Sequence, residues 1–186
     1  MGSTSSPDDT VAAAVAAAIG HDNGADADAL LAQLVAELQA AGRRVQGLLM
    51  QHEGGMAGDT ACGVEMFLVD VATSERYLVS QAMGSLSKAC RADPQGFARA
   101  TVVLRRALAD KPDLVVLNRF GRLEAEGGGM SAELLDLMAE GVPVLTAVAP
   151  AYRDAWAAFS GGAAVLPLDE AAARAWLDAT LAPQPA

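Results

Sequence analysis

One stretch of this chain decides its fold: residues 114–129, which read LVVLNRFGRLEAEGGG. Its first four residues are aliphatic and follow Pro112 and Asp113, a pattern typical of a fully buried strand in a parallel sheet. The strand then gives way to polar residues and glycines. Because open α/β sheets bind their ligands just beyond the carboxyl ends of such strands, we look for the functional site at residues 118–124.

Strand and helix patterns alternate along the rest of the chain. Apolar runs predict strands over residues 11–19, 45–51, 114–117, 142–148 and 164–166. Helical spacing predicts helices over residues 26–41, 96–110, 131–140, 152–159 and 169–181, the last capped by Asp169. Residues 64–69 and 76–81 are expected to pair as an antiparallel hairpin within an insertion of about residues 60–82. This order predicts an α/β fold, a doubly wound and mostly parallel sheet with helices on both faces.

Composition and charge narrow the class of protein. The 186 residues, 52% hydrophobic and 4% aromatic, fit a single domain over residues 11–182. A net charge of −10 argues against broad contact with nucleic acid or an anionic membrane. The chain shows no run of about 18 apolar residues and no basic signal-peptide start, so we expect a cytoplasmic protein without membrane insertion. Residues 1–10 are expected to be a disordered tail, and residues 183–186 a frayed end.

A glycine-bearing loop follows the first predicted strand and reads GHDNGADAD over residues 20–28. Backbone N–H groups at such a strand-to-helix turn, with the helix dipole, suit an anion. A phosphate loop needs the pattern G-x-x-x-x-G-K-[ST], but this loop has no Lys, Ser or Thr, and its three aspartates repel a triphosphate. The alternative is a plain turn with an acidic residue near the helix start. The predicted oxyanion contacts are Gly20, Asp22, Asn23 and Gly24.

The strand at residues 114–117 leads into Asn118 and Arg119. In phosphate-loop enzymes an acidic residue near this point holds Mg²⁺, whereas Asn replaces a carboxylate poorly and Arg repels a cation. Arg119 and Arg122 suit an anion instead, with Asn118 and Gly121 beside them. Glu124 would orient the arginines or, if the protein is an enzyme, act as the catalytic base. A solvated, ion-paired loop is the alternative.

A second polar segment, residues 81–91, could form another wall around an oxyanion, because it offers hydroxyls, backbone amides and two cations. The alternative is an ordinary surface loop. The two cysteines and two histidines of the chain have no zinc-site spacing, so we expect no metal site. The candidate ligand residues of this segment are Gln81, Ser85, Ser87, Lys88, Cys90 and Arg91.

Three motifs resemble one known family. Residues 118–129 are similar to the N-K-F-G-K-x-E-A-x-G-x-G signature of domain-of-unknown-function family 2478. Residues 62–66 (CGVEM) and 90–94 (CRADP) resemble its C-x-M-x-L-like and C-R-L-D-P landmarks, and the resemblance covers roughly residues 11–181. The chain departs from the family at Ala92, which replaces Leu, and at both signature lysines. Those positions hold Arg119 and Arg122, which keep the charge and improve bidentate contact with an oxyanion.

The resemblance implies both a fold and a biological setting. The family resembles thermophile-type nucleoside triphosphatases, which implies a phosphate-loop-type three-layer sandwich with a degenerate loop. Its members are commonly encoded beside molybdate-transport and molybdenum-cofactor genes. We therefore predict a protein that binds molybdate, tungstate or a phosphate-bearing, nucleotide-like small molecule, with a molybdate transporter or molybdenum-cofactor proteins as candidate partners. A residual nucleoside triphosphatase and a ligand-free interaction scaffold are the alternatives, and a homo-oligomer stays open.

Overall fold

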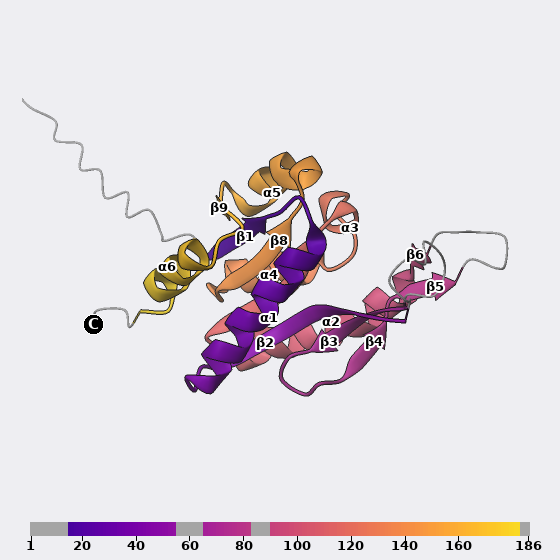
Figure 1. The fold of residues 1–186 in the computed structure, drawn as a ribbon, viewed down its shortest axis with the longest axis horizontal. Coiled ribbons are helices and arrows are strands. Elements are labelled where there is room, and N and C mark those ends of the chain that lie inside the picture. The colour runs from indigo at the N-terminus through magenta and orange to yellow at the C-terminus, as the bar shows by residue number, and fades with distance from the viewer. Residues whose placement is uncertain (1–14, 55–64, 83–89, 183–186) are drawn as a thin grey trace, which may run out of the picture.

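The structure is a computed structural model that describes residues 15–54, 65–82 and 90–182. Seven strands form one sheet in the order β4-β3-β2-β7-β8-β1-β9, and β5 and β6 form a separate antiparallel ribbon (Figure 1). The parallel strands are β1 (Ala16–Gly20), β2 (Val45–Glu53), β7 (Leu114–Phe120), β8 (Val144–Val148) and β9 (Ala164–Leu166). The antiparallel strands are β3 (Glu65–Asp70), β4 (Arg76–Leu78), β5 (Ser80–Ala82) and β6 (Cys90–Ala92).

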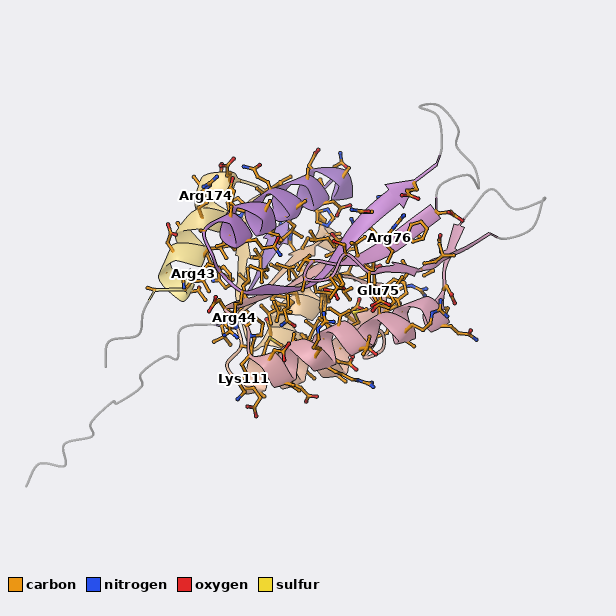
Figure 2. The ribbon with its side chains drawn as sticks, turned by 90° about the horizontal axis from the view of Figure 1, so that it is seen from below. Arg43, Arg44, Glu75, Arg76, Lys111 and Arg174 are labelled. Carbon is orange, nitrogen blue, oxygen red and sulfur yellow. The ribbon has the colours of Figure 1, made fainter. Side chains whose placement is uncertain are left out.

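Helices cover both faces of the sheet, and Figure 2 shows α1 on one side of the strands and α2 on the other. One face carries α1 (Gly24–Ala40) and α6 (Glu170–Thr180). The opposite face carries α2 (Pro94–Asp110), α4 (Ser131–Ala139) and α5 (Arg153–Ser160). The short helices α3 (Arg122–Ala125) and η1 (Pro150–Tyr152) follow β7 and β8. In the described part of the chain, no helix has the length and apolar character needed to cross a membrane.

The core consists of two apolar layers, one on each face of the sheet. In β7, Val115 and Leu117 pack toward α2 and α4, while Leu114 and Val116 pack toward α1 and α6. All four side chains are at most 3% exposed. The aliphatic run therefore forms a strand buried on both faces, as predicted, because helices cover the sheet on each side.

The predicted order of elements is confirmed, with differences at their ends. β7 continues to Phe120, beyond the predicted end at residue 117, and β2 continues to Glu53, beyond the predicted end at residue 51. β8 begins at Val144 rather than residue 142, because the Val142 N–H donates to Leu137 O and belongs to the end of α4. The ribbon of β5 and β6 and the helix α3 were not predicted.

The hairpin pairing is confirmed, and the structure shows where the hairpin lies. β3 pairs with both β4 and β2, which adds two antiparallel strands to the edge of the parallel sheet. The predicted tail, the frayed end, residues 11–14 and residues 62–64 of the CGVEM motif lie outside the described residues, and the domain bounds stay a prediction.

Two chain connections diverge at the carboxyl ends of neighbouring strands β1 and β8. The chain leaves β1 through α1, on one face, and returns in β2. It leaves β8 through α5, on the opposite face, and returns in β9 on the far side of β1. Since ligands of open α/β sheets bind where the strand order reverses in this way, the site should lie above β1 and β8.

Candidate functional site

The loop between β1 and α1 is a tight turn of residues 21–23. The His21 N–H donates to Val148 O at 3.1 Å, which ties the loop to the end of β8. Asn23 caps α1, and its Oδ1 accepts a hydrogen bond from the Ala25 N–H at 3.1 Å. This cap is the local reason that the helix begins here, since it satisfies one of the free N–H groups of the first turn. The amino end of α1 therefore faces the carboxyl edge of the sheet.

Two guanidinium groups pack against the two glycines that bound this loop. A Cβ added to Gly24 would lie 2.5 Å from Nη2 of Arg119, and one added to Gly20 would lie 2.9 Å from Nη2 of Arg153. Arg119 comes from β7 and Arg153 from the start of α5, so the sheet order brings three distant segments together. We call Gly20, Gly24, Arg119 and Arg153 the arginine site.

The charges of the arginine site are partly compensated. Arg119 Nη2 lies 3.0 Å from Oδ1 of Asp28, a residue of α1 whose side chain is 12% exposed. A guanidinium has five N–H donors, so this pair leaves several free for a ligand. Arg153 makes no ion pair or side-chain hydrogen bond with another described residue. The site thus combines one oriented cation with one available cation.

His21 lies between these charges with its side chain buried. Neither ring nitrogen has a hydrogen-bond partner among the described residues. Burial and the positive charge of Arg119 lower the pKa of His21, and Arg153 adds to this, while Asp28 and Asp22 oppose it. The imidazole is therefore neutral at neutral pH, with one nitrogen able to donate and the other able to accept.

A cavity of about 220 Å³ opens beside the arginine site, on the α2 side of the sheet. We call it the apolar cavity. Asn118 lines it, is 1% exposed, and has no hydrogen-bond partner for Oδ1 or Nδ2 among the described residues. Buried polar atoms normally find a partner, so an unpartnered amide in a cavity wall indicates a ligand position. The polar residues of the wall are Asn118, Arg119, Arg122 and Glu124.

Both carboxylate oxygens of Glu124 accept hydrogen bonds from backbone N–H groups. Its Oε2 accepts from the Gly121 N–H at 3.1 Å, and its Oε1 accepts from the Met130 N–H at 3.2 Å. Glu124 as a whole residue is only 6% exposed. Glu124 therefore joins the start of α3 to the start of α4, which gives the glutamate of the signature segment a structural role whether or not it has a catalytic one.

The structure brings some of the predicted site residues together. Gly20, Gly24 and Arg119 meet at the arginine site, and Asn118 and Gly121 line the apolar cavity next to it. Asn23 caps α1. Arg122 is exposed at the cavity, with Nη1 3.9 Å from Glu126, so it forms at most a loose ion pair.

The second wall predicted around residues 81–91 stays a prediction. In the β5–β6 ribbon, Gln81 pairs with Arg91 and Ala82 pairs with Cys90. The side chains of Gln81, Cys90 and Arg91 lie outside the described part of the chain, as do residues Ser85, Ser87 and Lys88 entirely. Among the described ranges, no three His, Cys, Asp or Glu side chains gather into a possible metal site.

The CRADP landmark starts a helix. Asp93 caps α2, and its Oδ1 accepts from the Gln95 N–H at 3.0 Å. Pro94 occupies the first turn, where its missing N–H costs no helical hydrogen bond. These two residues explain why α2 begins at Pro94 and not at the predicted residue 96.

Sequence reasoning did not assign Arg153 to the site, and it read Asp28 only as a repulsive charge. Arg153 follows η1 just beyond the carboxyl end of β8, as Arg119 stands near the carboxyl end of β7. The signal was therefore available: a basic residue shortly after a second apolar strand. His21 was considered only as a metal ligand. Its burial beside two arginines could not be predicted without knowing the strand order.

This combination defines a class of protein. The fold is that of an α/β protein of the phosphate-loop nucleoside triphosphatase type. It has a seven-stranded, mostly parallel sheet, helices on both faces and a strand–turn–helix unit at the switch point. The chain belongs to the family described as "Protein of unknown function (DUF2478)", which matches residues 16–176. The family resemblance seen in the three motifs is thereby confirmed.

The chain is also similar to a curated protein named Molybdenum import ATP-binding protein ModC 2, from Bradyrhizobium diazoefficiens. The two are 37% identical over 137 residues, which is 74% of this chain. The match spans 15% of the length of that relative. The name describes a much longer protein than the region in common.

Proposed function

We propose that this protein binds a small oxyanion-bearing molecule at the carboxyl edge of its sheet, in connection with molybdate transport. The observation that carries the proposal is the arginine site, in which Arg119 and Arg153 pack on the two glycines of the β1–α1 turn. Guanidinium N–H groups and the amino end of a helix both favour an oxyanion, and they converge here. Binding, without turnover, is the activity these groups support best.

Directed hydrogen bonds, more than net charge, support this binding. Asp28 and Asp22 oppose the effect of Arg119 and Arg153 on the pKa of His21, so the positive charge of the site is partly compensated. A tetrahedral oxyanion would therefore gain from the fixed orientation of Arg119, which its pair with Asp28 provides. Such positioning favours selectivity by shape, because the planar guanidinium presents its N–H groups in a fixed geometry.

The relative's name supports molybdate and tungstate as the first candidates. That name refers to molybdenum import and to ATP binding, and the matched region covers most of this chain. A molybdate transporter or a molybdenum-cofactor protein is accordingly the partner we propose. The same arginine site would also accept a phosphate-bearing molecule, since phosphate presents similar tetrahedral oxygens.

Hydrolysis of a nucleoside triphosphate is the alternative, and the local structure supports it less well. The β1–α1 turn spans only residues 21–23, without the Lys and hydroxyl that bind outer phosphates and Mg²⁺. Asn118 stands at the end of β7, where a Mg²⁺-binding carboxylate would be needed. Both oxygens of Glu124 already accept backbone hydrogen bonds, which weakens it as a base.

Calorimetric titration of the full chain tests the proposal. The ligands are molybdate, tungstate, phosphate, sulfate, ATP and GTP, each with and without Mg²⁺. We expect a tetrahedral oxyanion to bind without Mg²⁺. Arg119→Ala and Arg153→Ala should each weaken that binding by about tenfold or more, because a charge-assisted hydrogen bond contributes about 1.5–3 kcal/mol.

Arg43→Ala provides the matched control, since it removes the same charge elsewhere. Arg43 follows the carboxyl end of α1, as Figure 2 shows, and donates to Leu181 O. The length of α1 separates it from the loop by about 25 Å. Equal effects of all three substitutions would contradict the site. Mg²⁺-dependent nucleotide binding with phosphate release would favour the triphosphatase, and no response to any ligand would favour the ligand-free scaffold.

A further inference from the structure

The apolar cavity does not suit a bare oxyanion. Its wall is formed mainly by aliphatic, thioether and aromatic side chains: Met50, Leu68, Phe97, Leu117, Leu123 and Met130. An inorganic oxyanion placed there would lose its hydration without gaining hydrogen bonds over most of its surface, at a high cost in free energy. An apolar body would gain by entering the same space.

The polar groups of the cavity wall come from β7 and α3, and those of β7 adjoin the arginine site. Asn118 and Arg119 are consecutive in β7, and both line the cavity. The Asn118 amide and the Arg119 Nε are buried without a hydrogen-bond partner among the described residues. Glu124, the other buried polar residue of the wall, already accepts two backbone hydrogen bonds. The cavity thus has an apolar interior and an unpartnered polar edge.

We infer that the site takes organic oxyanions as well as inorganic ones: a single ring with one oxyanion group, with the ring in the apolar cavity and the anionic group at Arg119. This inference rests on the proposed function and names the ligand class for the same site. The volume of about 220 Å³ sets the size, because drug-sized ligands occupy about 300–1,000 Å³. The Asn118 amide would pair with a polar edge of the ring, since it offers both a donor and an acceptor.

This inference is tested with inorganic phosphate and phenyl phosphate, two probes whose only difference is a ring. Each is titrated into the full chain. We expect phenyl phosphate to bind about tenfold tighter or more, as burial of a ring predicts. Ala92→Phe should remove that difference and leave the affinity for inorganic phosphate unchanged. Ala92 is an exposed residue of the cavity wall, so a ring added there can occupy the cavity without replacing a core side chain.

Ala98→Phe is the control, because Ala98 is also exposed and lies on α2, in the wall of a neighbouring groove and not of the apolar cavity. It should keep the preference for phenyl phosphate. Thermal unfolding checks that both variants fold, and Leu123→Trp, at a half-buried position of the same wall, replaces Ala92→Phe if the latter does not.

Equal dissociation constants for the two probes would overturn the inference and leave the proposed function intact. A preference for phenyl phosphate that survives in the cavity-filled variant would also overturn it, because the ring would then bind elsewhere. If neither probe binds, the inference is overturned as well. In that case the molybdate and tungstate titrations of the unsubstituted chain decide whether the proposed function falls with it.

Discussion

The carboxylate of Glu124 occupies the space in which a side chain at Gly129 would begin, since a Cβ added to Gly129 would overlap Oε1 of Glu124. Gly129 also has a φ of +58°, in the left-handed region that favours glycine. The same carboxylate accepts hydrogen bonds from the Gly121 and Met130 backbone. The glutamate and this glycine of the signature segment therefore form one structural unit, which holds the connection between β7 and α4 in its conformation.

Gly129→Ala should lower the free energy of unfolding by about 2–4 kcal/mol. About 1–2 kcal/mol comes from the left-handed backbone, and the rest from displacing Glu124 from its backbone partners. Gly127→Ala is the matched control, because Gly127 has a φ of +80° but no atom within 4 Å of an added Cβ. Urea denaturation measures both. Equal losses would show that the contact with Glu124 contributes nothing.

Asn118→Leu should stabilise the unliganded protein by about 1–3 kcal/mol while weakening oxyanion binding. The substitution replaces an unpartnered buried amide by an apolar side chain with the same branching, and the desolvation penalty of that amide disappears. Urea denaturation and calorimetric titration of the same preparation measure the two effects. A less stable variant would mean that the amide has a partner in solution, such as an ordered water.

The sequence predicted the elements of the fold because their signals are local. Four consecutive aliphatic residues define β7, since helices bury both faces of that strand. Asp169 was predicted as a helix cap, and its Oδ1 accepts from the Ala172 N–H at 2.9 Å. Periodicity and capping depend on neighbouring residues alone, so they can be read from one chain.

The site was predicted only in part, because its geometry depends on strand order. Arg119 was predicted as an anion contact, but its pair with Asp28 joins residues 91 apart in the chain. Arg153 lies against Gly20 only because β1 lies between β8 and β9. Glu124 was predicted to orient the arginines or to act as a base, with an ion-paired loop as the alternative, whereas its carboxylate accepts hydrogen bonds from the Gly121 and Met130 backbone N–H groups. A local pattern can point to a residue such as Arg153, but it does not show which residues meet in the fold.

Asp70→Asn should destabilise the protein at neutral pH by about 1–3 kcal/mol and flatten its acid unfolding. Asp70 is fully buried and accepts hydrogen bonds from Arg106 Nη2 at 2.6 Å and Thr73 Oγ1 at 2.7 Å. Burial would raise the pKa of Asp70, but the hydrogen bonds from Arg106, Thr73 and the Ala72 N–H outweigh it, so the pKa is lowered.

The sign of the pH effect follows from that direction. A carboxyl whose pKa is lower in the folded state stabilises the protein above its unfolded pKa of about 3.9, and this contribution is lost as the pH falls through the folded pKa. Urea midpoints between pH 7 and pH 2.5 measure it. Asp178→Asn, at an exposed position of α6, should keep the acid dependence. An unchanged acid profile in Asp70→Asn would contradict the prediction.

His21 should make the folded protein less stable as the pH falls below about 6.5. Burial and Arg119 lower the pKa of His21 in the folded state, so the unfolded chain takes up a proton first and unfolding is favoured until the folded pKa is passed.

A bound oxyanion would reverse the preference of His21 for the neutral form, because it favours the imidazolium beside it. Oxyanion affinity should therefore rise as the pH falls, for an anion whose own charge is constant over the range. His21→Gln should lose both dependences, whereas His52→Gln, at the exposed end of β2, should keep them, and equal behaviour of the two variants would remove His21 from the site.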